Sequence, residues 1–177
     1  MAIVKLGELC EIIPGKKPNK DLHKYITKNK NDGFNWIKQK DLESFNILLK
    51  TSSYFKKEFI SMTRYTSGKN IYFFPDCDIK AFESKIDFCY DGHTWELINN
   101  EKILKKFLLY SINKNINNLK RQQVGTTLKF ITRSIFENFK IYVPTINDQQ
   151  KIIDIIEPFE NKLNELTNKL NIIKNIE

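Results

Sequence analysis

The chain has 177 residues, which suits one globular domain with an appended helix. Its formal net charge is +8, and 26 of its 29 basic residues are lysine. That balance favours a polyanion as partner, although a solvated lysine-rich surface has the same composition. No apolar run reaches the roughly 18 residues of a membrane span. Cys10, Cys77 and Cys89 form no CxxC pair, which argues against a disulfide framework and a zinc site. The start lacks a signal-peptide pattern, so we expect a cytoplasmic, reduced protein.

The first forty residues predict two short strands and two basic loops. An apolar stretch, VKLGELCEII, stops at PGKKPNK, a turn from which Lys16 and Lys17 project. After a glycine turn, FNWIKQKDL predicts a strand in which Trp36 belongs to the core. That strand ends in three polar side chains, Lys38, Gln39 and Lys40. Loops between strands are where binding residues usually lie, so both basic segments are candidates.

The middle of the chain predicts more strands and one helix. Ile71–Phe74 is strongly β-prone and ends at Pro75. Two short strands are expected next, divided by Asp91-Gly92 as a hairpin turn. An amphipathic helix follows over about 101–116. The segment SIFENFKIYVP then predicts one helical turn and a last strand.

The last thirty residues carry the strongest periodicity. Large apolar residues recur at alternating steps of four and three: Ile152, Ile156, Phe159, Leu163, Leu166, Leu170 and Ile173. This is an a/d heptad stripe, typical of a helix about 40 Å long that pairs with another helix. Asn147 and Gln150 have capping-box spacing at its start. Pro158 predicts a kink, or a break with the helix restarting there.

Two patterns in the sequence bear on enzyme activity. Asp76, Glu83 and Lys85 form a PD…ExK-like pattern that holds Mg²⁺ for phosphodiester hydrolysis when both carboxylates reach one ion. In a lysine-rich chain, Glu-x-Lys also arises by chance. Neither His23 nor His93 accompanies a nucleophile, so a hydrolase triad has little support, and we interpret His93 as structural. No nucleotide-binding loop is present. These patterns favour a binding module over an enzyme, with a purely structural helical module as a further hypothesis.

Clusters of cations with amide and hydroxyl side chains are the candidates for binding. Phosphates take the cations, and base edges take arginine, amide and hydroxyl groups. The candidate residues are Lys16, Lys17, Lys38, Gln39, Lys40, Thr63, Arg64, Ser67, Lys69, Arg121, Gln122, Thr126, Thr127 and Lys129. Arginine occurs only at 64, 121 and 133, in or beside these clusters. Any single cluster is equally typical of a solvated loop.

The order of these segments resembles a known family. It runs from LGEL and IIPGKKP through WIKQKDL and PDCDI to GTTLKFIT and FENFKIYVPTINDQQKIIDII. Together they resemble a specificity subunit of type I restriction-modification systems, with one target recognition domain and one helical region. The resemblance spans nearly the whole chain and is most specific over 125–156.

The resemblance implies an α/β fold: a mixed-sheet target recognition domain over 1–146 and a coiled-coil helical region over 147–177. It implies a non-catalytic protein that reads half of a bipartite DNA site. It also implies methyltransferase subunits as partners, which carry S-adenosylmethionine and methylate adenine, and restriction subunits in some systems. No cofactor is expected in this chain, and Asp76 would lie in an ordinary turn before a strand.

One departure from the family pattern concerns copy number. Family members usually carry two recognition domains and two helical regions in one chain, whereas this sequence has one of each. It is therefore interpreted as a half-length subunit or a fragment. The unpaired heptad stripe favours a homodimer with antiparallel helices, since a twofold axis then places one domain at each end.

Overall fold

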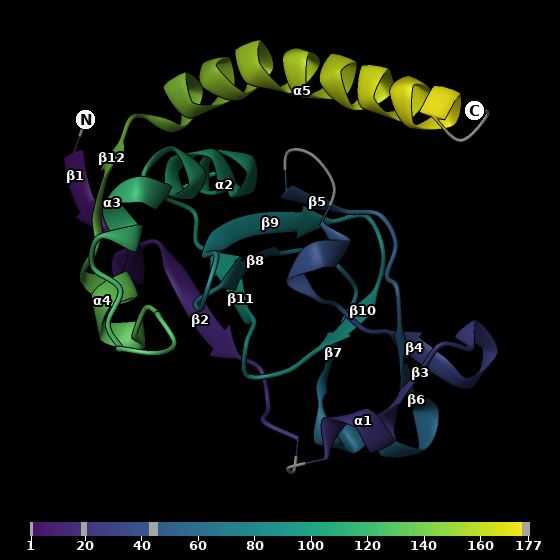
Figure 1. Cartoon of the computed structure of the whole chain (residues 1–177). Coiled ribbons are helices and arrows are strands. Elements are labelled where there is room, and N and C mark those ends of the chain that lie inside the picture. Colours follow the sequence, from purple (N-terminus) through teal and green to yellow (C-terminus); the bar gives the residue numbers. More distant parts are fainter. Residues whose placement is uncertain (1, 19–20, 43–45, 175–177) are drawn as a thin grey trace.

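The structure is a computed structural model that describes residues 2–18, 21–42 and 46–174, except for the side chains of 168 and 171–174. Its strands and short helices form one globular part, and a long C-terminal helix lies across the top of it (Figure 1). The helices are α1 (Leu22–Tyr25), α2 (Lys105–Lys114), α3 (Ile116–Lys120), α4 (Arg133–Asn138) and α5 (Ile146–Lys174). We call α5 the arm. No helix in the described part of the chain is long and apolar enough to span a membrane.

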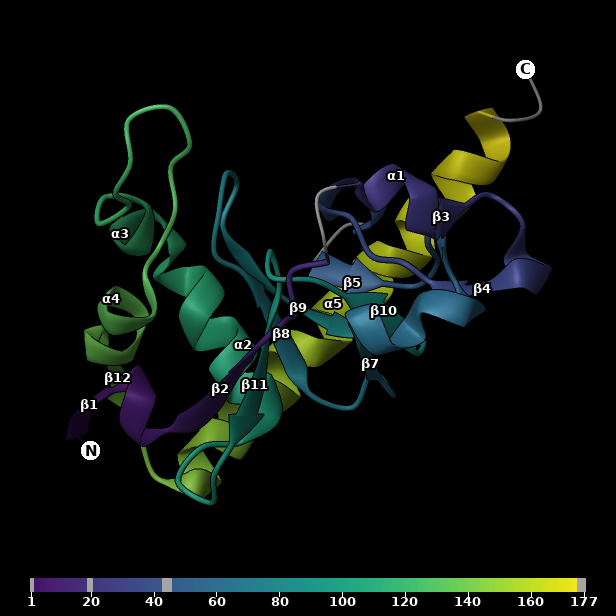
Figure 2. The same ribbon diagram turned by 90° about the horizontal axis from the view of Figure 1, so that it is seen from below.

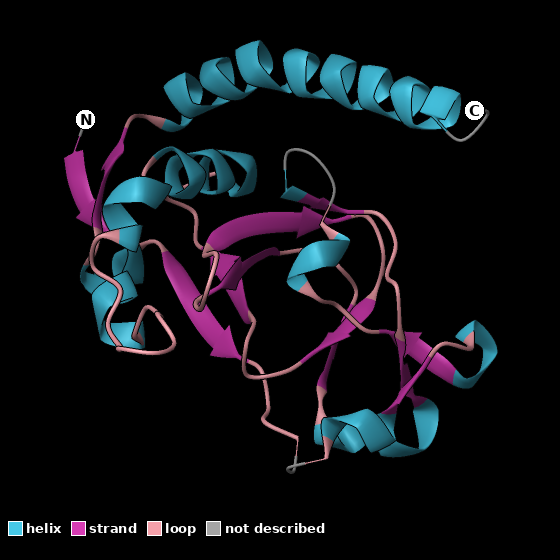
Figure 3. Ribbon diagram, viewed as in Figure 1, coloured by secondary structure: helices cyan, strands magenta, loops and turns pink. Residues whose placement is uncertain are grey.

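A mixed five-stranded sheet forms the centre of the globular part (Figure 3). Its order is β2 (Cys10–Pro14), β11 (Trp95–Asn99), β8 (Ile71–Phe74), β9 (Lys80–Ser84) and β5 (Ile47–Leu48). The β5–β9 pair is parallel and the other pairs are antiparallel. The predicted mixed-sheet α/β fold and the predicted strand at β8 are therefore confirmed.

Three smaller sheets complete the strands. The first is β3 (Ile26–Thr27), β6 (Tyr54–Lys56) and β4 (Gly33–Asn35); the second pairs β7 (Arg64–Thr66) with β10 (Phe88–Tyr90); the third pairs β1 (Ala2–Lys5) with β12 (Lys140–Val143). The predicted hairpin at Asp91-Gly92 is wrong. The chain does turn there, but β10 pairs with β7 while β11 joins the central sheet. A turn dipeptide specifies that the chain reverses and leaves open which strand becomes the partner.

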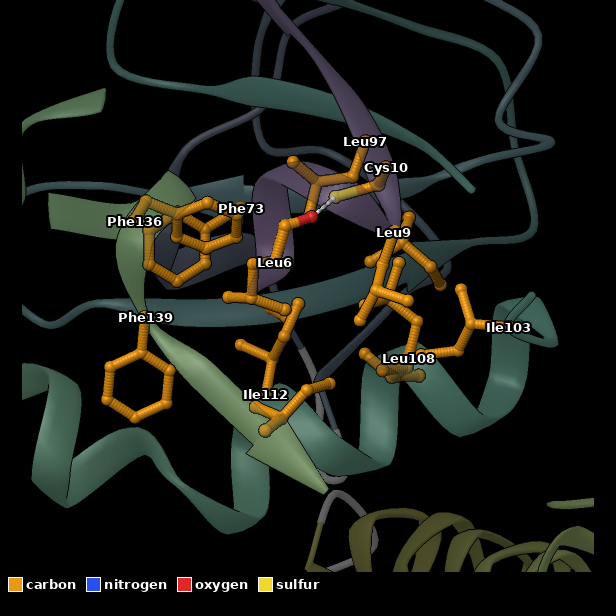
Figure 4. Close-up of a cluster of buried hydrophobic side chains, with 14 of the residues drawn as sticks. Leu6, Leu9, Cys10, Phe73, Leu97, Ile103, Leu108, Ile112, Phe136 and Phe139 are labelled. Carbon is orange, nitrogen blue, oxygen red and sulfur yellow. Dashed lines mark hydrogen bonds between the residues drawn. The ribbon is translucent and has the colours of Figure 1, made fainter. Parts of the chain in front are cut away.

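Both faces of the central sheet are buried, which explains the unbroken apolar run in β8. Alternate side chains of a strand point to opposite faces. Ile71 and Phe73 therefore enter the main core with α2 and α4, whereas Tyr72 and Phe74 enter a second cluster on the other face. Figure 4 shows Phe73 and Phe136 together in the main core, above the α2 side chains. Trp36 is buried in a third cluster, as predicted.

The predicted helices are confirmed, although their ends differ from the expectation. The amphipathic segment predicted over 101–116 forms α2 and continues into α3 after a break at Asn115. The arm begins at Ile146, and its cap is Thr145: the Thr145 hydroxyl donates to Asp148 (2.8 Å) and accepts from the Asp148 amide (3.3 Å). The predicted capping box at Asn147 and Gln150 is therefore wrong.

The arm is anchored in the globular part through its first two turns. Gln149 is fully buried, and its amide donates to the carbonyls of Lys102 and Pro144, both at 3.0 Å. Its side-chain oxygen accepts from the Leu104 amide at 2.8 Å. Ile153 packs into the main core at 5% exposure. The helix then continues through Pro158, so the predicted break is wrong; Figure 1 shows a gently arched helix.

The heptad stripe of the arm divides between two environments. Ile152 packs against the main core, and Ile156 lines a cavity between the arm and α2. Four later members stay exposed, as does Ile155, which the heptad stripe omits. This uncovered stripe is 44–68% exposed and consists of Ile155, Phe159, Leu163, Leu166 and Leu170. The side chain of Ile173 lies outside the described residues. The partner helix of a coiled coil therefore stays a prediction.

Candidate nucleic-acid interface

Five segments that are distant in sequence meet at one end of the central sheet. They are 15–17, 37–40, 75–78, 91–94 and 121–130, and we call their common surface the loop face. Figure 2 shows two of its parts, the loops that follow α3 and β8, projecting side by side. Backbone contacts join 15–17 to 91–94 and 75–78 to 121–130. The side chains of Gln39 and His93 both contact Asp76 and so connect 37–40 and 91–94 to 75–78.

The first contact brings the end of β2 against the 91–94 turn. The Gly15 amide donates to the Thr94 carbonyl at 3.0 Å, and Lys16 forms a bridge with Asp91. A Cβ at Gly15 would lie 1.8 Å from the Asp91 carbonyl oxygen, so only glycine permits this approach. The neighbouring Lys16 and Lys17 are exposed as a result.

The second contact fixes the loop between α3 and α4. Val124 and Phe130 exchange backbone hydrogen bonds at 2.9 and 3.0 Å, and the Cys77 amide donates to the Lys129 carbonyl at 2.9 Å. Gly125 has φ +98°, and a Cβ there would meet the Leu128 carbonyl at 2.2 Å. The loop therefore holds Thr126, Thr127 and Lys129 exposed next to the 75–78 turn.

Asp76 and His93 pair at the centre of the loop face. The Asp76 carboxylate is nearly buried and bonds Nδ1 of His93, whose side chain is 63% exposed. This hydrogen bond raises the pKa of His93 despite partial burial, and Asp91 adds to the rise while Lys17 opposes it. Gln39 donates to the Asp76 carbonyl at 3.0 Å. The bond to Asp76 agrees with the interpretation of His93 as a structural histidine, although most of its side chain is exposed.

A cavity of about 400 Å³ opens beside this pair. Its wall includes Lys17, His93, Leu128 and Arg133. Leu128 and Phe130 are exposed there, at 49% and 39%. The loop face thus combines cations, amide and hydroxyl groups, and apolar side chains, which is the mixture that contacts phosphates, base edges and thymine methyl groups.

The structure brings together most of the residues predicted to bind. Eight of them belong to the loop face: Lys16, Lys17, Lys38, Gln39, Lys40, Thr126, Thr127 and Lys129. Arg121 and Gln122 begin the segment 121–130 and are exposed at the end of α3, where Gln122 lines another cavity with Ser134 and Lys140. Arg64 lies at the edge of the loop face, where Nε donates to the Pro14 carbonyl at 2.8 Å. The sequence did not predict which of these segments contact one another, because contacts such as that between Asp76 and His93 depend on the order of the strands in the sheet.

Three predicted residues lie elsewhere. Thr63 is buried, and its hydroxyl donates to the Tyr90 carbonyl at 2.6 Å, so it serves packing. Ser67 and Lys69 are exposed in the turn between β7 and β8, at the opposite end of β8 from Asp76. The Lys69 carbonyl accepts from Lys105 at the start of α2 (2.9 Å), which places that turn near the arm.

The nuclease hypothesis finds no support in this geometry. In the β8–β9 pair, Phe74 lies opposite Lys80 and Ile71 opposite Glu83. Glu83 is thus three residues along β9 from the turn that carries Asp76, at least about 10 Å away at roughly 3.3 Å per residue. Glu83 is bound instead by Lys106 at 2.8 Å. Among the described residues, no group of three or more histidine, cysteine or acidic side chains is arranged to hold a metal ion.

The family model of the type I restriction modification DNA specificity domain matches residues 1–177. The chain belongs to this family. One relative is the type I restriction enzyme EcoR124I/EcoR124II specificity subunit of Escherichia coli, 25% identical over 174 residues, which cover 93% of this chain and 42% of the relative. Another is the MjaVIII specificity subunit of Methanocaldococcus jannaschii, 30% identical over 67 residues, which cover 38% of this chain and 16% of the relative. The resemblance read from the sequence is confirmed.

Solved structures show the same fold. The HsdS subunit from Thermoanaerobacter tengcongensis superposes with a TM-score of 0.67 at 16% identity, over 93% of this chain and 38% of that one. The type I S subunit from M. genitalium gives 0.66 at 16% identity, over 94% and 41%. The chain thus spans about two fifths of the longer relatives that it matches throughout. Since these relatives are specificity subunits, the expectation that the chain is not an enzyme is confirmed, and the nuclease alternative is set aside.

Proposed function

We propose that this chain recognises duplex DNA sequence for a type I restriction-modification DNA adenine methyltransferase complex. The observation that carries the proposal is the loop face, in a chain that belongs to the DNA specificity family. Its exposed cations suit the phosphates on either side of a groove. Gln39, His93 and the hydroxyls of Thr126 and Thr127 supply donors and acceptors for base edges.

The arm supplies the second element of the proposal. An uncovered stripe of five large apolar side chains on one helix is the surface that a coiled-coil partner covers. A second copy of the chain, with its arm antiparallel, would cover it through a twofold axis. Such a dimer presents two loop faces and reads a symmetric bipartite site. The length and direction of the arm then determine the gap between the half-sites.

Partners follow from the same proposal. The chain divides into a recognition domain over 1–146 and a helical region over 147–177. Methyltransferase subunits bring S-adenosylmethionine and methylate adenine, and restriction subunits join in systems that cleave DNA. This chain itself holds no cofactor, and the complex acts on DNA in the cytoplasm. Family resemblance supports these partners, and the chain supplies the DNA-reading surface.

Methylation mapping tests the proposal. The chain is co-expressed with the methyltransferase subunit of the same system, and adenine methylation is mapped over the host genome by single-molecule sequencing. We expect methylation at one bipartite, symmetric motif. A matched culture carries Gln39→Ala with Thr126→Ala, which removes two loop-face readers and should relax or abolish the motif. Methylation without a motif, or a motif that both cultures share unchanged, would contradict the assignment of sequence reading to the loop face.

A further inference from the structure

The arm makes a second contact with the globular part, two residues after Pro158. The Glu160 side chain is 14% exposed and accepts from the Tyr110 hydroxyl at 2.7 Å. Its carboxylate also lies 3.2 Å from Nζ of Lys106. Lys106 and Tyr110 both belong to α2, so Glu160 joins the arm to the helix beneath it.

This contact continues into the central sheet. Lys106 donates to Glu83 of β9 at 2.8 Å, and the side chains of Lys106 and Glu83 are 15% and 6% exposed. Burial alone would lower the pKa of Lys106, but the carboxylates of Glu83 and Glu160 outweigh the effect of burial and raise that pKa. Burial and the Glu160 carboxylate raise the pKa of Tyr110, so its hydroxyl remains a donor at all ordinary pH values. One lysine between two carboxylates thus connects sheet, α2 and arm.

Glu160 makes the last such contact in the described part of the arm. Beyond it, the hydrogen bonds and ion pairs of the described residues join arm residues only to one another, as in Lys162–Glu165 and Glu165–Lys169. Pro158 lacks the amide that would bond to the Asp154 carbonyl, so the helix is easiest to bend over 154–158, just before the position that Glu160 restrains. The direction of the arm therefore depends on two points, the buried Gln149 and Ile153 at its start and Glu160 farther on.

The part of the arm that extends beyond its anchor at Ile153 is long. From Ile153 to Lys174 the helix measures about 31 Å at roughly 1.5 Å per residue. A tilt of about 10° about Ile153 would move its far end by about 5 Å, which is more than the roughly 3.4 Å that separates successive base pairs. A small loss of restraint at Glu160 would therefore change the distance between the two globular parts of the proposed dimer by the length of one base pair or more.

We propose that Glu160, held by Lys106 and Tyr110, is a positioning residue that fixes the direction of the arm and thereby the number of base pairs between the two half-sites. The part concerning DNA rests on the proposed function, whereas the restraint on the arm does not. The role proposed for Glu160 requires no contact with DNA or with the partner. It acts through the helix that carries it.

A distance measurement tests the restraint without DNA. Spin labels are placed at the exposed positions Asn118 of α3 and Lys169 of the arm, as Asn118→Cys and Lys169→Cys, with exposed Cys77 replaced by serine; Cys10 and Cys89 are buried. Labelled chains are diluted with unlabelled chains, so that pulsed electron paramagnetic resonance measures the distance between the two labels within one chain. We expect one narrow distance, which Glu160→Ala broadens and shifts by about 5 Å.

Three further variants separate positioning from loss of fold. Tyr110→Phe removes one hydroxyl and should broaden the distance less. Glu160→Gln keeps an acceptor for Tyr110 and should retain much of the narrow distribution. Glu165→Ala is the matched control, since Glu165 lies on the same helix and its remaining ion pair in the labelled chain, with Lys162, lies within the arm. An unchanged distance in Glu160→Ala, or an equal change in Glu165→Ala, overturns the restraint.

The DNA readout uses duplexes with the two half-sites separated by a series of spacer lengths, in the presence of the methyltransferase subunit. Wild type should bind one spacer best, and Glu160→Ala should shift or broaden that optimum by at least one base pair with affinity for an isolated half-site unchanged. If Glu160→Ala changes the label distance but leaves the spacer optimum the same, the positioning role of Glu160 is overturned. Absence of DNA binding by wild type refutes the proposed function instead, while the label distances still decide the restraint.

Discussion

The loop face and the arm are two binding surfaces built in opposite ways. The loop face gathers short polar segments from residues 15 to 130, held by backbone contacts such as that between Cys77 and Lys129. The arm presents one apolar stripe along a single helix, with nothing in the described structure covering Phe159 or Leu163. The first is polar and suits a polyanion; the second is apolar and suits a helix. Their difference predicts that each can be damaged without the other.

The largest expected effect is loss of the proposed dimer after charges enter the uncovered stripe. Leu163→Lys with Leu166→Lys places two ammonium groups where an antiparallel partner would pack, and burying them is unfavourable. Light scattering should give the 21.0 kDa of one chain in place of twice that mass. The melting profile of the globular part and binding to an isolated half-site should not change. Lys162→Gln, on the polar side of the same turn, is the control. A dimer that survives the double change would assign the contact to another surface.

The next effect tests whether the two halves of the arm differ as the structure indicates. Ile153→Ala removes a side chain from the main core and should lower the free energy of unfolding by about 2–5 kcal/mol. Leu166→Ala removes an exposed side chain of the same class and should leave the unfolding of the isolated chain unchanged. Denaturant unfolding at a concentration where the chain is monomeric measures both. Equal losses would mean that the uncovered stripe is packed within the chain.

Local patterns predicted the parts of the fold that depend on neighbours in sequence. The β-prone run at Ile71–Phe74, the helix that became α2 and the long arm were all readable, because strand and helix periodicity is set within a few residues. The heptad count also showed that the stripe needs cover. It did not show that Ile152 is covered by the main core of its own chain while Leu166 is uncovered.

The loop face could not be predicted from the sequence, because it depends on pairing between strands that are distant in the chain. Asp76 and His93 belong together because β8 and β11 are adjacent in the central sheet, and no spacing rule gives that order. Lys69 and Lys129 look alike in the sequence, because each has a glycine and two serine or threonine residues among the four positions before it. The structure places them at different ends of the globular part, since Lys129 contacts Cys77 and Lys69 contacts Lys105. The composition predicted a basic surface, but only the order of the strands determines which lysines and arginines lie on it.

These two lysines give a third, smaller effect. Lys129→Ala removes a cation from the loop face and should weaken DNA binding at every sequence, lowering the slope of log affinity against log salt by about one. Lys69→Ala removes the same charge from the opposite end and should change neither quantity. Both slopes are measured by fluorescence anisotropy on the same duplex over a salt series. If Lys69→Ala lowers the slope as much as Lys129→Ala, then DNA contacts the end of the sheet near the arm.

The smallest effect is a pH dependence that only the loop face should show. Asp76, aided by Asp91 and opposed by Lys17, raises the pKa of His93 above its ordinary value. The imidazolium is therefore populated below that raised pKa and lost as the pH rises through it. DNA affinity should fall across the same window by up to about fivefold, since a partly exposed ion pair contributes about 1 kcal/mol or less.

His93→Gln isolates this titration from the rest of the molecule. It keeps a polar side chain without the charge, so half-site affinity should become flat across the window, while dimer mass stays the same at each pH. The His93–Asp76 pair also stabilises the fold, and because the folded-state pKa is raised, that stability is fully present below the ordinary histidine pKa and declines as the pH rises through the raised one. Affinity is therefore measured well below the melting temperature. If affinity falls equally in His93→Gln, another group on the loop face carries the titration.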